Sequence, residues 1–540
     1  MKKAISVALT AAMIAVMTAG CGGSSSKTPD AGSSSAATAE SGTQGTAATG
    51  DKYVNYAAVD PQVALDPQRN TYSIIMKMTD NIIESLVTTM DDGTLEPTLI
   101  TALPELSEDK LTYSFELKDG VKFHNGETVT SEDVKYSLER VVKMQKMASL
   151  MEKVEGYEAL ASGEADELTG IKVVDDTHFT ITLTSVYTPF VSVLSTPYCA
   201  VYPKAACEEA GENWGKTVLI GTGPFKMDSY TTSVGCDISR FDDYHGEKAK
   251  LDGVHFKFIE DVNTQVMEYQ KGNVDYTDLD TSLYPVYANN PQLKDQIHGF
   301  QPVGGYSMSF NVKTISDPKV REAISLSIDR QAICESILHG TATPASSYIP
   351  DSLIGHDDSL EVFPYDPEKA KQLLAEAGYP DGYDLRISVN TKYSVSVALA
   401  TAVQEQAKAA GINVQIEQVD SAAWSDMKLA GGIDCSISNW YVDYNDPDSM
   451  LYPVNETATQ TNSTFYQNDE FTKLMNEGIQ TADEAERDEI YKKAEHILTR
   501  EDWAVAPLYN ETKYYLLNPR VTGFEIGSTF RTFFKNADIQ

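Results

Sequence analysis

A strand, a helix and a second strand in succession constrain the fold of this 540-residue chain more than any other feature. Residues 385–389 read as a strand, a helical stretch follows near 394–410, and apolar residues then alternate with polar ones over 412–416. Two strands joined in this way lie parallel in one sheet, with a right-handed crossover between them. Ligands of such sheets bind beyond the carboxyl ends of the strands, which predicts a site around residues 390–392.

Regular patterns elsewhere predict further strands and helices. Thr130 and Asp133 have the spacing of a capping box, and Asp366 followed by Pro367 is a typical helix start. Strict alternation of apolar and polar residues predicts half-buried strands in three more segments: 111–117, 179–183 and 254–258. The body of the protein is therefore expected to have a mixed α/β fold.

The first fifty residues predict export. Two lysines precede an apolar run over residues 4–16, which has the length of a signal-peptide core and is too short to span a membrane. The run leads to Cys21 in a segment similar to the bacterial lipobox, in which the cysteine thiol carries the lipid; an ordinary secretory signal with a coincidental cysteine is the alternative. Residues 22–50 contain no large hydrophobic side chain to bury. We predict a lipoprotein signal peptide over 1–20 and a lipidated, disordered tether over 21–50.

Charge excludes one class of partner. The chain has 79 acidic and 43 basic residues, and its net charge of −36 is opposite in sign to what nucleic acids and anionic membrane surfaces attract. No nucleic-acid partner is expected. An acidic protein instead attracts small cations and peptides with free amino groups.

Cysteine usage leaves an odd number of thiols if Cys21 carries lipid. Cys199 and Cys207 are close enough in sequence for a small-loop disulfide, whereas buried free thiols are the alternative for most of the five later cysteines. No cysteine or histidine pair has zinc-site spacing, so no metal site is predicted from these residues.

Sequence motifs of catalysis are missing. The chain has no nucleophile elbow, no HExxH, no Walker loop and no GxGxxG, so neither an enzyme nor a cofactor is expected. Residues 443–448 superficially resemble a calcium loop but lack its glycine and terminal glutamate. His124 is expected to be a structural turn residue.

Short blocks along the chain resemble one protein family. In order they are LDP at 65–67, LITALP at 99–104, TYSF at 112–115, GVKFHNG at 120–126, DVKYS at 133–137, GTGPF at 221–225, VREA at 320–323 with IDR at 328–330, YDP at 365–367 through AGY at 377–379, and WYVDY at 440–444. Together they resemble the oligopeptide- and dipeptide-binding lipoproteins of ABC importers, solute-binding family 5.

The resemblance implies an α/β fold of the periplasmic-binding-protein type, class II or cluster C, with two large lobes about a hinge and a third, smaller lobe. Position-for-position matching gives lobe I as 51–83, 205–303 and 512–540, lobe II as 84–204, and lobe III as 304–511. A peptide would lie in the cleft between two lobes that close on it.

The implied function is extracytoplasmic: a monomeric substrate-binding protein captures a peptide ligand and delivers it to the membrane permease subunits of an ABC importer. It would be anchored by lipid on the outer face of the cytoplasmic membrane, or be periplasmic. Two alternatives remain, an exported lipoprotein hydrolase and the same fold binding a non-peptide solute such as a nickel chelate or an oligosaccharide.

The resemblance also implies ligand-binding residues. Asp443 matches the aspartate that binds the α-ammonium group of the ligand, although a turn residue would also fit that position. Asn439 and Tyr441 match a strand that offers main-chain hydrogen bonds to an extended peptide, and Thr71, Tyr72 and Ser73 match the peptide-facing strand of the opposite lobe. Trp440 and Trp424 are expected either to line side-chain pockets or to pack in a core.

One part of the family pattern is missing. The positions that align with basic or histidine side chains meeting the ligand carboxylate are Thr196, Leu338, Val395 and Ile437, none of which is charged. Lys392 is the one nearby cation that the sequence suggests, and a solvated surface lysine is the alternative for it. The sequence thus predicts an amine-binding group without a fixed carboxylate-binding group.

Overall fold

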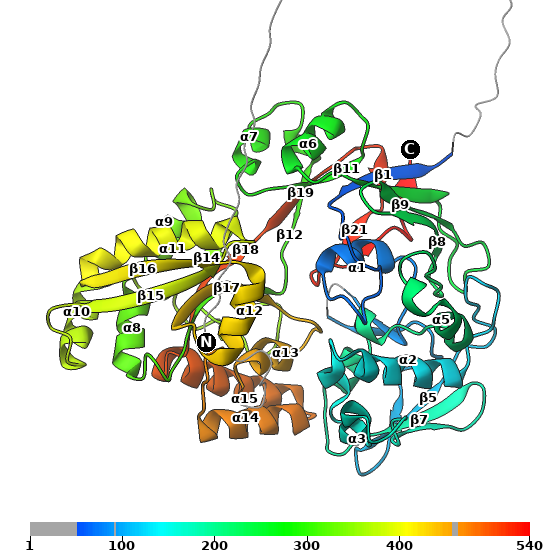
Figure 1. The fold of residues 1–540 in the computed structure, drawn as a ribbon, viewed down its shortest axis with the longest axis horizontal. Coiled ribbons are helices and arrows are strands. Elements are labelled where there is room, and N and C mark those ends of the chain that lie inside the picture. Colours follow the sequence, from blue (N-terminus) through cyan, green and yellow to red (C-terminus); the bar gives the residue numbers. More distant parts are fainter. Residues whose placement is uncertain (1–50, 91–92, 456–462) are drawn as a thin grey trace, which may run out of the picture. The chain divides into compact units, whose positions relative to one another are not determined.

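The computed structural model describes residues 51–90, 93–455 and 463–540 (Figure 1). The predicted signal peptide, the tether and Cys21 lie outside the described residues. Everything below concerns the body that begins at Asp51.

A seven-stranded sheet is built from the beginning, the middle and the end of the body. Its spatial order is β12 (Ile297–Phe300), β19 (Lys513–Leu517), β11 (Tyr276–Leu279), β1 (Tyr53–Ala58), β10 (Gly253–Phe258), β9 (Gly235–Arg240) and β8 (Phe225–Thr231). Strands β1 and β10 run parallel, with Val54 opposite Val254 and Tyr56 opposite Phe256. These four side chains are buried in one core. The strand predicted over 254–258 is confirmed.

A six-stranded sheet contains the strand–helix–strand unit expected from the sequence. Its spatial order is β14 (Ala342–Pro344), β18 (Val505–Glu511), β13 (Gly304–Phe310), β17 (Cys435–Tyr441), β15 (Tyr383–Asn390) and β16 (Ile412–Val419). Strands β15 and β16 are parallel, and α11 (Ser394–Ala407) connects them. Leu399 and Val403 of α11 are buried in the core of this sheet. The predicted parallel pair is therefore confirmed.

A four-stranded antiparallel sheet lies between residues 105 and 182. Its order is β4 (Glu105–Leu106), β5 (Thr112–Glu116), β7 (His178–Thr182) and β6 (Ile171–Val173). Phe115 stacks on Phe179 across the β5–β7 pair, with ring centroids 4.8 Å apart. The helix α2 (Ser131–Met144) covers this core and begins with the predicted capping box of Thr130 and Asp133.

The remaining elements are helices and short ribbons. The helices are α1 (Ser73–Thr79), α3 (Tyr157–Ser162), α4 (Phe190–Val193), α5 (Lys204–Ala210), α6 (Val262–Gln270), α7 (Tyr284–Ala288), α8 (Pro318–Leu326), α9 (Arg330–Ser336), α10 (Pro367–Glu376), α12 (Ser421–Ala430), α13 (Pro447–Leu451), α14 (Asp469–Gln480) and α15 (Glu484–His496). The ribbons pair β2 (Val87–Thr89) with β3 (Leu95–Pro97), β20 (Val521–Thr522) with β23 (Asp538–Ile539), and β21 (Glu525–Ile526) with β22 (Thr532–Phe533). Asp366 caps α10, as predicted.

Two short segments join the seven-stranded and six-stranded sheets. Residues 301–303 connect β12 to β13, and Thr512 alone separates β18 from β19. The chain thus leaves one sheet and enters the other almost without a break.

One expected strand is wrong. Thr71 and Tyr72 lie outside any strand, and Ser73 is the first residue of α1. The burial of Ile75, Met78 and Thr79 explains the difference, because this spacing of three and four residues is helical.

The cysteines of the body are buried free thiols. All five carry no disulfide, and Cys199 and Cys207 belong to different hydrophobic cores. The free-thiol alternative is therefore the one that the structure supports.

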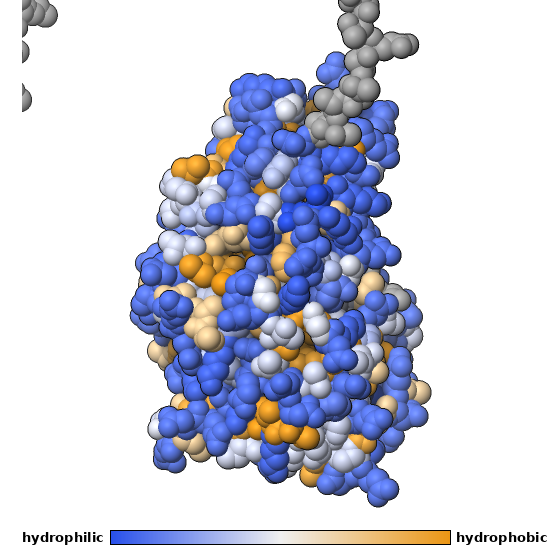
Figure 2. Space-filling model, turned by 90° about the vertical axis from the view of Figure 1, so that its right-hand side faces the viewer, coloured by the Kyte–Doolittle hydropathy of each residue, from blue (hydrophilic) through white to orange (hydrophobic). Residues whose placement is uncertain are grey.

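Surface character agrees with the acidic composition. Polar residues cover most of the face seen in Figure 2, and hydrophobic residues form small separate patches on it. Within the described ranges, no helix has the length and the apolar character needed to cross a membrane.

Candidate functional site

Asp443 lies just after β17 as a partly buried carboxylate. Its backbone N–H donates a hydrogen bond to Ser449 Oγ at 2.9 Å, which fixes the turn after the strand. The hydroxyl of Tyr198 donates a hydrogen bond to its carboxylate. Burial raises the pKa of Asp443 to about 6, although the Tyr198 hydrogen bond acts in the opposite direction.

Two buried carboxylates elsewhere in the protein have a direct cationic partner. Asp66 pairs with Arg140 at 2.6 Å, and Asp80 pairs with Arg531 at 3.1 Å. Among the described residues, no basic side chain forms an ion pair with Asp443, and no cation contributes to its pKa. Taking a carboxylate out of water without a counter-charge is unfavourable. The carboxylate of Asp443 is thus partly withdrawn from water without a counter-charge from the described residues.

A network of hydroxyl groups and carboxylates holds the segment after Asp443. Tyr444 inserts into the core of the four-stranded sheet. Its hydroxyl donates to Asp448 Oδ2 at 2.8 Å, and the hydroxyl of Tyr187 donates to the same oxygen at 2.9 Å. Burial also raises the pKa of Asp448 to about 6. The segment that carries Asp443 is thus fastened to a part of the chain distant in sequence.

One edge of β17 is free where the predicted peptide-binding residues lie. Strand β17 pairs with β13 along its whole length, but it pairs with β15 only at Cys435 and Ser436. Beyond Ser436, the described residues provide no strand partner on the β15 side. Asn439 and Tyr441 lie in this half of β17, whose main-chain groups can bind an extended chain.

The aromatic residues of β17 point to opposite faces of the sheet. Trp440 packs against the core formed around α14 and α15, and its Nε1–H donates to the carbonyl of Ser449 at 2.9 Å. Tyr441 lies edge-on to Phe530 with ring centroids 4.9 Å apart, and its hydroxyl donates to Glu511. Trp440 therefore packs against a core and helps to fix the turn at Asp443, and a pocket-lining role for its exposed part stays a prediction.

Residues from two distant segments meet at the carboxyl end of β15. Thr71, Tyr72 and Ser73 are exposed. Lys392 is exposed as well, and its ammonium group lies 5.0 Å from the centre of the Tyr72 ring. This cation–π contact brings Tyr72 to the strand end at which the β-α-β unit predicts a ligand.

Trp424 lies on α12, where no residue is buried. It is half-buried and belongs to none of the hydrophobic cores of the described residues. Trp424 therefore does not pack in any of these cores, and its pocket-lining role stays a prediction.

The positions aligned with carboxylate-binding residues are unsuited to that role. Leu338 and Ile437 are buried in the core of the six-stranded sheet, and Val395 packs against the same core. Thr196 is buried, and its hydroxyl donates to the carbonyl of Val193 at 2.9 Å. These four residues cannot offer a charge to a ligand.

Sequence reasoning missed two polar side chains, Tyr198 and Lys428. Tyr198 follows the aligned residue Thr196 by two positions, yet no motif connects it with Asp443. Lys428 stands four residues after Trp424 on α12. This spacing of about one helix turn places both side chains on one side of the helix, and it was the sequence signal that could have connected Lys428 with Trp424.

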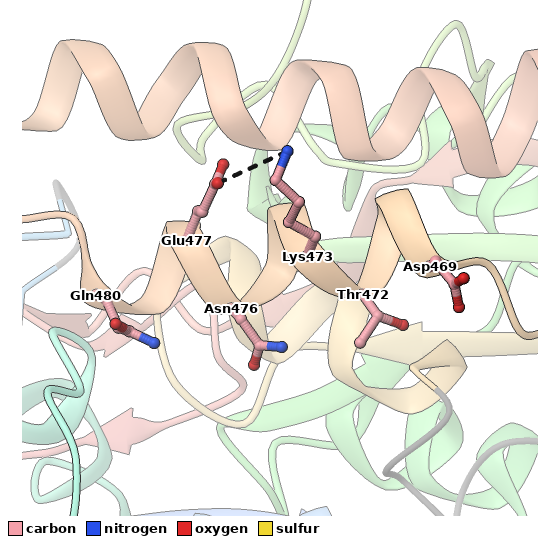
Figure 3. A pocket seen from close by; sticks show the side chains of 6 residues that line it. All are labelled: Asp469, Thr472, Lys473, Asn476, Glu477 and Gln480. Atoms are coloured by element: carbon pink, nitrogen blue, oxygen red, sulfur yellow. Dashed lines mark ion pairs between the residues drawn. The ribbon is translucent and has the colours of Figure 1, made fainter.

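Other parts of the described chain offer weaker candidate sites. A depression on the surface of α14 is lined by six residues of that helix, including Lys473 and Glu477, which lie 3.9 Å apart (Figure 3). Across the described ranges, no group of three or more His, Cys, Asp or Glu side chains is arranged to hold a metal ion. In the segment that resembles a calcium loop, Asp446 pairs with Arg487 at 2.7 Å.

His124 has a structural role. Its Nδ1 accepts the N–H of Gly221 at 3.3 Å, which leaves Nε2 to donate to the carbonyl of Gly223 at 2.9 Å. Burial lowers the pKa of His124 to about 4, so the ring is neutral at neutral pH.

Comparison with known proteins identifies the family. The profile of the bacterial extracellular solute-binding proteins, family 5 (middle region), matches residues 94–462. The chain belongs to this family. The resemblance seen in the sequence is thereby confirmed.

Relatives of this family 5 protein are binding proteins by name. The glutathione-binding protein GsiB of Escherichia coli (strain K12) is 28% identical over 453 residues, which cover 81% of this chain and 84% of GsiB. The murein tripeptide binding protein MppA of Escherichia coli has a TM-score of 0.78 at 24% identity, covering 92% of this chain and 99% of MppA. AgaA of A. tumefaciens R10, in complex with agropinic acid, has a TM-score of 0.75 at 26% identity, covering 91% and 99%. The multi-lobe periplasmic-binding-protein fold is confirmed.

Proposed function

We propose that this solute-binding protein captures peptides by their α-ammonium group and delivers them to the permease subunits of an ABC importer. The observation that carries the proposal is the partly buried carboxylate of Asp443, which has a hydroxyl partner and no cation among the described residues. A charge-assisted hydrogen bond from an ammonium group supplies the missing counter-charge. GsiB and MppA, named for glutathione and a murein tripeptide, are relatives with peptide ligands.

The free half of β17 supports an extended ligand. Within residues 437–441, the alternate main-chain groups that are not directed at β13 face the side on which β15 no longer pairs. A peptide that binds there as an added strand is read through its backbone, which accommodates different side chains. In this proposal Asn439 and Tyr441 provide the strand, and Asp443 binds the amino terminus of the peptide. Trp424 lines a side-chain pocket. The opposite side of the ligand is approached by Thr71, Tyr72 and Ser73.

The proposed lobes keep the boundaries predicted above. Each of the three larger sheets lies within one lobe, and the links at 301–303 and Thr512 are the proposed hinge. Ala200 and Tyr202 lie near the end of the proposed lobe II but pack in the core of the seven-stranded sheet, which belongs to lobe I. The core of lobe I therefore includes a few residues from before the boundary at 204. Closure of two lobes on a ligand excludes water and strengthens the ammonium–carboxylate contact.

The proposed setting is the cell envelope. In it, Cys21 carries the lipid, residues 22–50 act as the tether, and the protein works as a monomer on the outer face of the cytoplasmic membrane or in the periplasm. Metabolic labelling with a fatty acid tests the anchor: label that disappears in Cys21→Ala supports it, and label retained in that variant contradicts it.

Binding to defined peptides tests the function. We expect a tripeptide with a free amino terminus to bind the purified mature protein, its N-acetylated form to bind at least about tenfold more weakly, and Asp443→Asn to remove that difference. Glu477→Gln on α14 is the matched carboxylate control and should behave as wild type. Equal binding of free and acetylated peptides by wild type would refute the role of Asp443.

The same experiment separates the alternatives. Mass spectrometry of the bound material distinguishes capture, which leaves the peptide intact, from hydrolysis, which yields products. AgaA, which was solved with agropinic acid, supports a non-peptide ligand as the second candidate. A non-peptide compound recovered from the purified protein, together with no binding of peptides, would favour that candidate.

A further inference from the structure

Lys428 on α12 is a partly buried cation without a counter-ion. Its side chain has no ion pair, hydrogen bond or aromatic partner among the residues that the structure describes. Burial lowers its pKa, and no acidic group acts against this effect. Other lysines that are largely covered have a carboxylate close by, such as Lys77, which lies 2.8 Å from Asp278. A covered ammonium group without such a partner is unfavourable in the ligand-free protein.

The helix that carries Lys428 has an incompletely covered inner face. Trp424, Met427 and Lys428 recur at intervals of three and four residues, so they lie on one side of α12. All three are half-buried, whereas Ser425, Asp426 and Leu429 are exposed. No residue of α12 is buried, although core-facing helices such as α11 bury several. This side of α12 therefore carries an aromatic ring, a thioether and an ammonium group that the rest of the described chain covers only in part.

Both ends of α12 are fixed at the sheet that carries the candidate site. At its start, Asp420 caps the helix and Ser421 Oγ donates to Asn390 Oδ1 at 3.0 Å, at the carboxyl end of β15. At its end, the carbonyl of Gly431 accepts a hydrogen bond from Asn311 at 3.3 Å, and β17 follows after a short turn. The helix that carries Lys428 is consequently anchored at the carboxyl end of β15 and close to the start of β17.

We propose that Lys428 binds a carboxylate group of the ligand whose α-ammonium group binds Asp443. This inference rests on the proposed function and narrows its substrate class to peptides with a carboxylate, either the C-terminal one or that of an acidic side chain. Asp443 and Lys428 form no ion pair with each other, and neither charge contributes to the pKa of the other. A zwitterionic ligand that spans the two supplies each with its counter-charge.

Two other cations fit this role less well. Lys392 is exposed, and its ammonium group already lies over the rings of Tyr72 and Tyr393. Arg531 is buried in an ion pair with Asp80 and also donates to the carbonyl of Ser195. Lys428 is the covered cation for which the described residues offer no partner.

Calorimetric titration with four peptides tests the assignment. The peptides are Ala-Ala-Ala, its C-terminal amide, Ala-Glu-Ala amide and N-acetyl-Ala-Ala-Ala, and the proteins are wild type, Lys428→Met, Lys428→Arg and the surface control Lys473→Met. We expect Lys428→Met to weaken binding of at least one carboxylate-bearing peptide by about ten- to hundredfold and to leave binding of the Ala-Ala-Ala amide within about twofold of wild type. Lys428→Arg should retain most of the affinity. Whether the free acid or the Ala-Glu-Ala amide loses affinity identifies the carboxylate.

The outcomes separate this inference from the proposed function. If binding depends on Asp443 and on a free amino terminus, but Lys428→Met binds every carboxylate-bearing peptide as wild type does, the role of Lys428 is overturned and the proposed function stands. If wild type binds none of the four peptides, both are overturned. An equal loss of affinity for Ala-Ala-Ala and for its C-terminal amide in Lys428→Met would also overturn the assignment. Thermal unfolding of each variant shows that it is folded.

Discussion

The hydroxyl of Tyr198 donates a hydrogen bond to the carboxylate of Asp443 and joins the end of β17 to a turn that belongs to a different part of the chain. Tyr198 is 4% exposed, so its hydroxyl has little access to water. The bond favours the ionised form of Asp443, which is the form that binds an ammonium group.

Replacement of Tyr198 by phenylalanine should change the pH dependence of binding more than the affinity at neutral pH. Without the donor, the pKa of Asp443 rises further, and we expect the midpoint of the pH profile to move upward by about one unit. Affinity at neutral pH should fall by no more than about threefold, because the ligand-free protein already makes this hydrogen bond. Titrations of Tyr198→Phe over a pH series provide the measurement. Tyr113→Phe, which alters another buried tyrosine, is the control, and a midpoint identical to wild type in Tyr198→Phe would contradict the prediction.

Peptide affinity should fall in acid because Asp443 takes up a proton. Its pKa of about 6 places the change near that pH, and the ligand's α-amino group is protonated throughout this range. Well below the midpoint, we expect the peptide affinity to fall about tenfold for each unit by which the pH is lowered. Asp448 has a pKa of about 6 as well, so Asp448→Asn is needed to separate the two groups. The prediction requires the profile to persist in Asp448→Asn and to flatten in Asp443→Asn.

Neutralising Asp443 should stabilise the ligand-free protein. Because its pKa is higher in the folded state than in the unfolded chain, the free energy of unfolding falls as the pH rises from about 4 to about 6 and stays lower above that range. Asp443→Asn should therefore increase the free energy of unfolding at neutral pH by about 1–3 kcal/mol. Denaturant unfolding of the ligand-free protein measures this change.

The matched variant is Asp66→Asn, which removes the partner of the buried Arg140. Here we expect destabilisation by about 3–5 kcal/mol, because an uncompensated charge remains buried. Destabilisation by both variants would mean that Asp443 has a favourable partner within the folded protein.

Gly304 should be irreplaceable at the start of β13. Its φ is +142°, and a Cβ atom there would lie 2.1 Å from the carbonyl oxygen of Trp440. Gly304→Ala should therefore displace β17 and lower both the free energy of unfolding and the peptide affinity. Gly340→Ala is the control, because φ is +77° there but the space is open, so it should cost only about 1–2 kcal/mol and leave binding unchanged. Normal binding by Gly304→Ala would contradict the role of this close contact.

Local sequence signals predicted much of the fold. The β-α-β unit of β15, α11 and β16, the capping box at Thr130 and the cap at Asp366 depend on residues a few positions apart, so periodicity and spacing reveal them. The strand expected at 71–73 was wrong because the apolar residues that follow have helical spacing, which outweighs a match of short blocks.

The candidate site was only partly visible in the sequence. Asp443 was found through its block, but its partner Tyr198 is brought to it by tertiary packing, which no local pattern encodes. Likewise, the isolation of Lys428 is apparent only when every neighbouring carboxylate has been placed. The two tryptophans differ for the same reason: Trp440 contacts a core built from α14 and α15, whereas Trp424 lies on a helix that buries no residue.

The five cysteines of the body have a practical consequence for watching the protein at work. All are buried, and burial raises the pKa of Cys199, Cys236 and Cys334 to about 12. Maleimide dyes react with exposed thiolates, so these thiols should stay unlabelled while the protein is folded. In a protein that begins after Cys21, a pair of introduced surface cysteines, one near each large sheet, would accept fluorophores selectively. Energy transfer between them would then report, in a single molecule, any change in the distance between the two sheets.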